Sequence, residues 1–433
     1  MTIGDTLTRD PLTGLLNYES ARDSLHGWLS GSGEGPQIHA MLVGLGRFDA
    51  VNLAYGEAAG DGALAEVAQR LLHFSRDEFE LQDSLVSRLG GGKFLLVVRG
   101  TCSRERWQWL AEALADALSG SLSPNEAAPA LKLWPRLALM RAVPGDDAEL
   151  MLDRLADAMG DMQGSVGRRI GWIDREAAPA GTSGARLEAD LLKALAGKQI
   201  HLCFQPQFDA SGRIAGAEAL ARWDHPELGR IGAGTLFAIA ERTDQTAALS
   251  RAIAEMALAA ATEWPDGLDL SLNITSADLA VPDLARSLLE LADRAGFSPE
   301  RLILEITEQV LVTDLELAAD TLAMLRAAGA RIALDDFGAG FCNFRYLKVL
   351  PLDYLKLDQA MVEGIGEDPR DLAVLRGIVA MAGALDIAVI AEGVESELQR
   401  DLVMAEGCLK WQGFLGAKPL PPGQFIALAA GNG

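Results

Sequence analysis

Short apolar runs recur through the second half of the chain, and each ends at or beside an isolated polar or charged residue. Stretches rich in Ala and Leu, of helical length, separate most of them. Such runs are typical of buried strands, and eight of them alternating with helices predict a closed (β/α)8 TIM-like barrel of about 250 residues, with its chemistry at the C-terminal ends of the strands. The eight runs are 200–204, 214–222, 268–272, 302–304, 332–334, 354–357, 388–391 and 409–411.

The first half of the chain predicts a different α/β domain. Strand-like runs at 40–45, 94–98 and 131–141 alternate with helical patterns at 64–74 and 104–118. Between the halves, a stretch rich in Ala, Gly, Pro and Ser has the composition of a linker. We therefore expect an N-terminal domain at 1–174, a linker at 175–184 and the barrel domain at 185–433.

Composition narrows the classes of partner. Hydrophobic residues make up 49% of the 433, and 61 acidic against 38 basic residues give a formal net charge of −23. Such a field repels nucleic acids and anionic membrane surfaces, so neither is an expected partner. Widely spaced cysteines argue against zinc and disulfides, and the sequence shows neither a signal peptide nor an apolar run long enough to span a membrane. We expect a cytoplasmic protein.

The polar residues at the predicted strand ends indicate a metal site. Glu218, Leu220 and Arg222 alternate on one strand and therefore share a face. Taken alone, Glu218 and Arg222 are equally consistent with a buried ion pair. The same rim also receives other oxygen ligands, and crowded carboxylates without His or Cys favour Mg²⁺, Mn²⁺ or Ca²⁺ over zinc. These further residues are Asn273, Glu305, Asp335, Asp336 and Glu392.

Two such ions suit phosphoryl chemistry, because one activates water while both stabilise charge on phosphate oxygens. Lys356 is placed to orient that water or to neutralise developing charge. Glu392 is placed to accept its proton. The alternative, that these are surface carboxylates on unrelated loops, requires each strand to end in a suitable residue by accident.

From about residue 187 to 422, the sequence resembles the EAL phosphodiesterases, which cut cyclic di-GMP to the linear dinucleotide pGpG. The signature corresponds to Glu218-Ala219-Leu220. The matching motifs also include Gln205-Pro206, Asn273-Ile274-Thr275, Glu305-Ile306-Thr307-Glu308, Asp335-Asp336-Phe337-Gly338, Asp353-Tyr354-Leu355-Lys356, Glu392-Gly393-Val394-Glu395 and Gln412-Gly413-Phe414.

The resemblance implies a role for each matching residue, a pair of Mg²⁺ or Mn²⁺ ions and a homodimer formed through the barrel. Glu392 and Lys356 would flank the nucleophilic water, and Glu308 would brace the loop after Asp336. The implied metal ligands are Glu218, Asn273, Glu305 and Asp335 for one ion, with Asp335 and Asp336 for the other. The implied substrate contacts are Gln205, Leu220, Arg222, Gln412 and Glu395.

One loop departs from the family pattern. Cys342 and Asn343 stand where the family usually has two serines. Both residues keep small or polar character, so we expect a functional loop, while its coupling to dimer contacts stays open.

The N-terminal half resembles a GGDEF diguanylate cyclase domain, of ferredoxin-like fold, without its catalytic residues. The match is carried by the motif at 10–17, by Phe48, Asn52, Gly60-Asp61 and by Arg88-Leu89-Gly90-Gly91. The signature loop continues as Gly92-Lys93-Phe94, and Gly44 and Gly46 stand where the family has metal-binding aspartates. Cyclisation of GTP needs Mg²⁺ held by those acids, so we expect no cyclase activity. Asn52 and Asp61 match nucleotide contacts, which leaves a regulatory GTP site as an open alternative.

These observations predict a metal-dependent cyclic di-GMP phosphodiesterase with a degenerate cyclase-like domain. The alternative is a receptor that binds cyclic di-GMP without cutting it and signals through the other domain. Receptors of this kind usually lack one or more of the rim carboxylates, and all are present here.

Overall fold

The computed structural model describes residues 8–30, 37–46, 48–80, 82–119, 133–143, 146–163, 169–173, 184–197, 199–281, 283–307, 315–338 and 344–431. Two compact units contain them. The first comprises residues 1–187 with 224–238, and the second comprises 188–223 with 239–433. Most of the predicted linker, together with Glu308, Cys342 and Asn343, lies outside the described residues.

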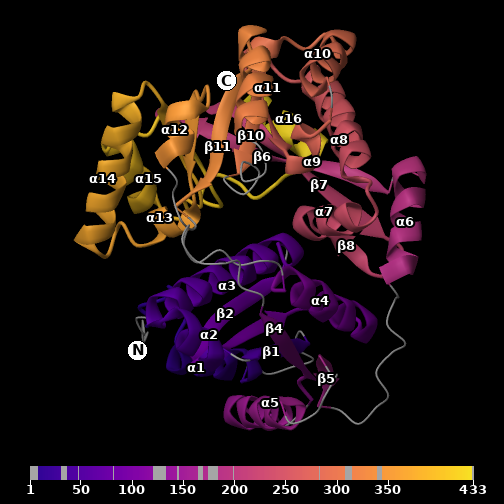
Figure 1. Ribbon diagram of the computed structural model, residues 1–433, viewed down its shortest axis with the longest axis vertical. Coiled ribbons are helices and arrows are strands. Elements are labelled where there is room, and N and C mark those ends of the chain that lie inside the picture. The colour runs from indigo at the N-terminus through magenta and orange to yellow at the C-terminus, as the bar shows by residue number, and fades with distance from the viewer. Residues whose placement is uncertain are drawn as a thin grey trace. The chain divides into compact units, whose positions relative to one another are not determined.

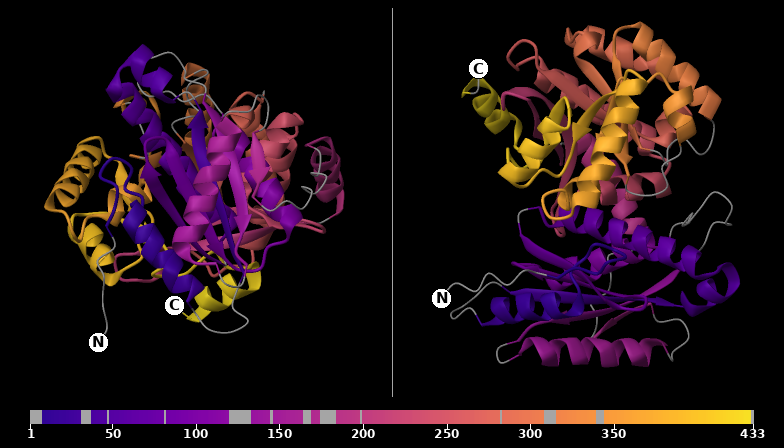
Figure 2. Two further views of the ribbon diagram at one scale, coloured as in Figure 1. Left: turned by 90° about the horizontal axis from the view of Figure 1, so that it is seen from below. Right: turned by 90° about the vertical axis from the view of Figure 1, so that its left-hand side faces the viewer.

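The N-terminal unit is built around a five-stranded sheet with the order β2-β3-β1-β4-β5. Its central strand, β1, pairs antiparallel with both β3 and β4. Helices cover both faces of the sheet (Figures 1 and 2), as the α/β prediction requires. The strands are β1 (Ile38–Gly46), β2 (Asp83–Gly90), β3 (Lys93–Arg99), β4 (Trp134–Arg141) and β5 (Ile170–Trp172), and the helices are α1 (Tyr18–Leu29), α2 (Phe48–Tyr55), α3 (Glu57–Glu78), α4 (Arg104–Ala117) and α5 (Ala148–Gln163).

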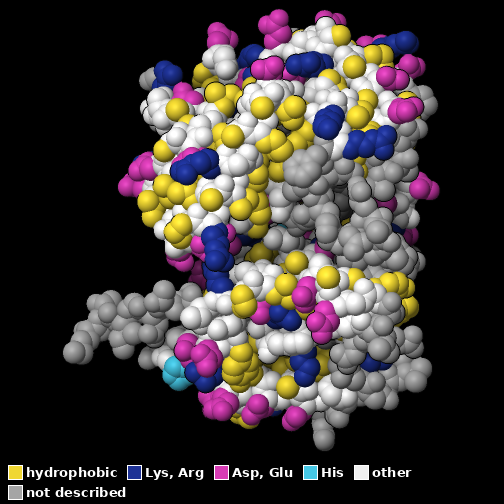
Figure 3. Space-filling view, turned by 60° about the vertical axis from the view of Figure 1, so that its left-hand side comes forward, with side chains coloured by type: hydrophobic (Ala, Val, Ile, Leu, Met, Phe, Trp, Pro, Cys, Tyr) yellow, Lys and Arg dark blue, Asp and Glu magenta, His cyan; other side chains and the backbone are white. Residues whose placement is uncertain are grey.

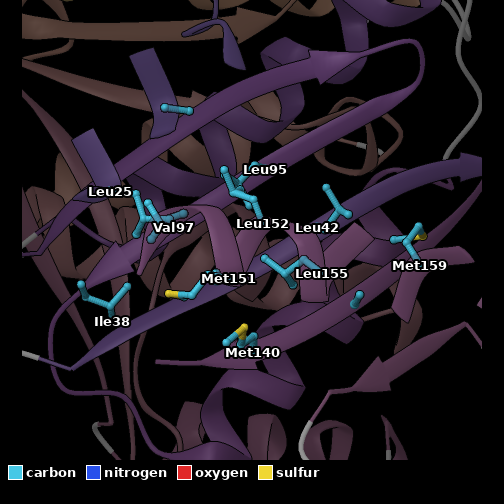
Figure 4. Close-up of a cluster of buried hydrophobic side chains, with 14 of the residues drawn as sticks. Leu25, Ile38, Leu42, Leu95, Val97, Met140, Met151, Leu152, Leu155 and Met159 are labelled. Carbon is cyan, nitrogen blue, oxygen red and sulfur yellow. The ribbon is translucent and has the colours of Figure 1, made fainter. Parts of the chain in front are cut away.

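Alternation along β1 places every second side chain on the same face of this sheet. Ala40 and Leu42 pack with Leu25 of α1 and with Leu155 and Met159 of α5 (Figure 4). Burial of this apolar cluster holds the two helices against the sheet.

The second unit contains the predicted barrel. Its strands follow the order β6-β14-β13-β12-β11-β10-β9-β7, and pairing between β6 and β7 closes the ring. All eight predicted strand runs lie in these strands, with helices outside them (Figure 1). The strands are β6 (Ile200–Asp209), β7 (Ile214–His225), β9 (Asp269–Ile274), β10 (Leu302–Thr307), β11 (Arg331–Phe337), β12 (Tyr354–Leu357), β13 (Ala388–Ala391) and β14 (Lys410–Gln412).

One feature differs from a regular alternation of strands and helices. Strand β6 connects directly to β7 and runs antiparallel to both β7 and β14. The short β8 (Gly229–Ile231) extends the sheet next to β7. The remaining elements are α6 (Gly184–Gly197), α7 (Ala233–Arg242), α8 (Thr246–Ala261), α9 (Ser276–Leu279), α10 (Leu284–Ala295), the 3₁₀ helix η1 (Pro299–Arg301), α11 (Leu315–Ala327), α12 (Phe344–Val349), α13 (Gln359–Glu363), α14 (Pro369–Ala384), α15 (Glu397–Ala405) and α16 (Pro422–Gly431).

The surface of this acidic protein carries side chains of both charges. On the face drawn in Figure 3, lysine and arginine side chains are interspersed with acidic ones. Among the described residues, no helix combines the length and the apolar character needed to cross a membrane.

Candidate metal-dependent active site

Parallel pairing of the barrel strands brings the predicted carboxylates together. Asn273 on β9 pairs in register with Glu305 on β10, while Glu218 on β7 pairs with Ser271 on β9. Asp335 lies near the end of β11, and Glu392 directly follows β13. Side chains from separate strands therefore converge at the end of the barrel where the sequence places the site.

Lys356 on β12 lies at the centre of this cluster. Its side chain is fully buried, and its Nζ lies within 4 Å of four carboxylates. The distances from Nζ are 2.6 Å to Glu305 Oε2, 2.7 Å to Glu392 Oε1, 3.1 Å to Asp335 Oδ1 and 3.6 Å to Glu218 Oε2. In this structure the lysine binds the carboxylates to one another through its own charge.

Two amides hold Glu218 in place. Asn273 Nδ2 donates to Glu218 Oε1 and Gln412 Nε2 donates to Glu218 Oε2, both at 2.8 Å. Burial acts to raise the pKa of Glu218, but the charge of Lys356 and the two amide donors outweigh it and lower the pKa. Glu218 is therefore ionised and held in one orientation by its donors.

The other carboxyls around Lys356 show the opposite balance. Burial raises the pKa of Glu305 and Asp335, and it raises the pKa of Glu392 to about 8, although Lys356 opposes the shift in each case. Burial also acts to lower the pKa of Lys356, but the carboxylates around it raise that pKa well above its ordinary value. Burial and mutual repulsion thus disfavour full ionisation of these carboxyls, and a divalent cation would relieve that repulsion.

The adjacent aspartates divide the cluster into two groups. Asp336 has φ of 57°, in the left-handed region that non-glycine residues seldom adopt. Its backbone N–H donates to Asp335 Oδ1 at 2.9 Å. Oxygen atoms of Glu218, Glu305 and Asp335 lie within 4.8 Å of one another, and the same holds for Asp335, Asp336 and Glu392. The strained turn thus makes Asp335 common to both groups.

These residues fit hard divalent cations. The donors are carboxylate and amide oxygens, which suit Mg²⁺ and Mn²⁺. Glu305 Oε1 is buried and has no hydrogen bond of ordinary geometry within the described part of the chain. A buried anionic oxygen without a donor is an available ligand atom.

The predicted substrate residues differ in burial and in hydrogen-bond partners. Gln205 and Leu220 are half-buried within the strand pair β6 and β7, and Arg222 is buried and donates to the Ala221 carbonyl at 2.8 Å. Gln412 bonds to Glu218, so it supports a ligand residue directly. Glu395 is exposed, and its Oε1 accepts from Gln359 at 3.3 Å, apart from the carboxylate cluster.

Sequence reasoning missed two buried polar residues of the barrel interior, Gln207 and Ser271. Both side chains are fully buried. A signal was available, because Gln207 follows Gln205 by two positions and Ser271 precedes Asn273 by two. Residues two apart on a strand share a face.

In the N-terminal unit, the predicted nucleotide residues differ in exposure. The Asn52 Oδ1 atom is buried and has no hydrogen-bond partner among the described residues, while Asp61 is exposed. Gly90 ends β2 with φ of 117°, and Gly91, with φ of 55°, begins the turn to β3.

The sequence matches the EAL domain family over residues 188–419, more than half of the chain. It also matches the diguanylate cyclase GGDEF domain over residues 7–162. The chain is a tandem GGDEF–EAL protein. Both resemblances found in the sequence are thereby confirmed at the level of the family.

Named relatives share this domain order over most of the chain. The bifunctional diguanylate cyclase/cyclic di-GMP phosphodiesterase MucR of Pseudomonas aeruginosa is 32% identical over 400 residues, covering 90% of this chain and 57% of MucR. The cyclic di-GMP phosphodiesterase PdeR of Escherichia coli is 28% identical over 422 residues, covering 96% of this chain and 62% of PdeR. This GGDEF–EAL chain therefore spans less than two thirds of either relative.

A solved structure supports the barrel. The MucR phosphodiesterase in complex with c-di-GMP superimposes with a TM-score of 0.53 at 33% identity, covering 56% of this chain and all of that one. The agreement covers the part of the GGDEF–EAL chain that carries the carboxylate cluster.

Proposed function

We propose that this protein hydrolyses cyclic di-GMP to pGpG in a reaction that depends on Mg²⁺ or Mn²⁺. The observation that carries the proposal is the presence of two clusters of carboxylates. They share Asp335, which lies 3.1 Å from Lys356 Nζ. The names of MucR and PdeR, and the c-di-GMP complex of the MucR phosphodiesterase, support the substrate.

The residues divide into ligands and proton carriers. Glu218, Asn273, Glu305 and Asp335 would hold one ion, and Asp335 with Asp336 the second. When bound, these ions would activate a water molecule and stabilise charge on the phosphate oxygens. Burial raises the pKa of Glu392 to about 8; bound cations would lower that pKa, and the ionised Glu392 would then accept the proton of the water. Lys356 keeps Glu392 and Glu305 in place through contacts of 2.7 Å and 2.6 Å.

Substrate seating is the role we propose for Gln205 and Arg222, two polar side chains of β6 and β7 beside the cluster. Gln205 pairs in register with Glu218, so it lies next to the site on β6. Arg222 lies two pairs along β7 from Leu220, toward the same rim. A guanidinium there would bind a phosphate oxygen.

We further propose that the GGDEF domain makes no cyclic di-GMP. A Cβ at Gly44 would lie 2.7 Å from Met159 Sδ, and one at Gly46 would lie 2.9 Å from the Trp134 carbonyl oxygen. The positions of the missing aspartates are thus closely packed by neighbours. The signature loop is Gly90-Gly91-Gly92-Lys93. Its Lys93 brings a positive charge to the place where acidic residues would hold the metal.

The deciding experiment measures cyclic di-GMP hydrolysis by the full chain with Mn²⁺, with Mg²⁺ and with EDTA. We expect turnover with either metal, none with EDTA, and loss of turnover in Glu218→Ala. The matched control is Glu255→Ala. Glu255 is half-exposed on α8, where its carboxylate pairs with Arg251 at 3.2 Å. Tight binding of cyclic di-GMP without turnover would instead support the receptor.

The same preparation tests the other parts of the proposal. Incubation with GTP should yield no cyclic di-GMP, and its formation would show that the N-terminal domain is a cyclase. Added GTP that changes the hydrolysis rate would establish the regulatory site at Asn52 and Asp61. Light scattering would test the homodimer that the EAL resemblance implies.

A further inference from the structure

Beside the carboxylate cluster, the barrel interior contains a polar pair that no proposed catalytic step uses. Gln207 on β6 and Ser271 on β9 both have 0% of their surface exposed. Gln207 Nε2 donates to Ser271 Oγ at 3.4 Å. Barrel interiors are filled mainly by branched apolar side chains, and burying polar groups is unfavourable unless they are paired. The presence of two polar side chains at these buried positions therefore indicates a function.

Strand register places the pair directly next to the metal ligands. Ser271 pairs with Glu218 across β7 and β9, and Gln207 pairs with Gln412 across β6 and β14. Each of these partners takes part in the cluster, since Gln412 donates to Glu218. The pair thus lies among the ligand residues and not at the far end of the barrel.

Ser271 also lies beside Glu305. It precedes Asn273, the register partner of Glu305, by two residues and shares a strand face with it. Its hydroxyl is also among the groups that oppose the rise in the pKa of Glu305 caused by burial. Lys356 binds only one oxygen of this carboxylate, Oε2, at 2.6 Å. Oε1 has no hydrogen bond of ordinary geometry among the described residues. Ser271 is therefore placed to favour one orientation of the Glu305 carboxylate.

We propose that Ser271 and Gln207 are positioning residues that orient the Glu305 carboxylate for a divalent cation. A hydroxyl has one proton. Because the Gln207 amide donates to the oxygen of Ser271, the hydroxyl proton is left to donate elsewhere, and the acceptor that we assign to it is the Glu305 carboxylate. Partners of metal ligands fix ligand orientation in this way. The inference rests on the proposed function, since it assigns Glu305 to the metal.

The test measures Mn²⁺ binding to the full chain by calorimetry and by the loss of the free-ion electron paramagnetic resonance signal. We expect Ser271→Ala and Gln207→Met each to weaken Mn²⁺ binding by roughly 10-fold. Hydrolysis should need correspondingly more metal and recover when metal saturates. Because the two residues act in series, the double variant should bind no more weakly than Ser271→Ala.

Two further variants make the outcome decisive. Thr321→Val changes another buried hydroxyl, on α11 outside the strand ring, and should leave Mn²⁺ binding unchanged. Asp335→Asn should abolish Mn²⁺ binding. Unchanged binding in Asp335→Asn would overturn the proposed function itself.

If Asp335→Asn loses the ion while Ser271→Ala and Gln207→Met bind it normally, only the positioning inference fails. A lower unfolding temperature of the metal-free variants, with unchanged Mn²⁺ affinity, would also overturn it by making the pair merely structural. Should Ser271→Ala fail to fold, Gln207→Met alone decides, because methionine matches glutamine in length.

Discussion

Replacing Lys356 with methionine would remove the cation that holds the carboxylate cluster together without metal. Three carboxylate oxygens lie 2.6, 2.7 and 3.1 Å from its Nζ. At an effective dielectric constant of about 20, one such contact is worth roughly 6 kcal/mol of attraction before desolvation. After desolvation, loss of one partner from a buried pair costs about 3–5 kcal/mol of unfolding free energy. We expect Lys356→Met to destabilise the metal-free protein by that amount.

The assay is urea unfolding in EDTA, read at the transition whose midpoint Mn²⁺ raises in the wild type. Mn²⁺ should restore much of the stability of Lys356→Met, because the ion replaces the missing positive charge. Acid should restore part of it, because protonated carboxyls no longer repel. Hydrolysis should stay low in the presence of Mn²⁺, since Glu392 loses its partner.

Lys410→Met is the matched control. Lys410 is also buried, and its Nζ lies 2.7 Å from Asp269 Oδ2, at the starts of strands β14 and β9. Its replacement should destabilise the barrel equally with and without Mn²⁺. The electrostatic reasoning fails if Lys356→Met unfolds at the wild-type midpoint in EDTA, or if Mn²⁺ leaves its deficit unchanged.

Three further expectations follow from the same contacts. The pKa of Glu392 is raised from its ordinary 4.5 to about 8, so its contribution to metal-free stability is present below its ordinary pKa and is lost as the pH rises through about 8. Urea midpoints in EDTA should therefore fall between about pH 5 and pH 8, and a rise would contradict the shift. Glu392→Gln should bind cyclic di-GMP nearly as well as the wild type while cleavage is suppressed, as calorimetry and product chromatography would show; equal losses would assign Glu392 to binding. Asp269→Asn removes the anion that pairs with Lys410 and Arg331 and should lower stability by about 3 kcal/mol at unchanged kcat, so a loss of turnover without unfolding would refute a purely structural role.

The barrel could be predicted from the sequence because its strands are buried on both faces. Such strands read as continuous apolar runs, and all eight were found. Strand direction left a weaker signal. Only four residues separate β6 from β7, too few for a crossover helix, so the antiparallel pair could have been inferred from the connection length.

Two strands of the N-terminal unit were missed for a different reason. β2 begins with exposed residues and lies at the edge of the five-stranded sheet, while β5 has three residues. Short or partly exposed edge strands carry little apolar pattern. Their place in the sheet depends on pairing with β3 and β4.

The site was predictable in its ligands and not in its supports. Glu218, Glu305 and Asp335 end or interrupt apolar runs, so they stand out as isolated charges. The hydrogen bond from Gln412 to Glu218 joins residues 194 positions apart, so no local sequence pattern predicts it. Ser271 likewise reads as an ordinary small residue until β7 and β10 flank it.

Charge balance links the lysine to the proposed ion pair. Glu218, Glu305, Asp335, Asp336 and Glu392 carry five negative charges when ionised, and Lys356 supplies one positive charge among them. Four negative charges then remain in a largely buried space, which explains why burial and mutual repulsion raise the pKa of Asp335. Two divalent ions would balance that charge without bound protons. A single ion would leave the group around Asp336 and Glu392 partly protonated, and Glu392 could then not act as a base at neutral pH. The number of ions and the protonation of Glu392 are therefore one question, and Mn²⁺ stoichiometry measured at neutral pH answers both.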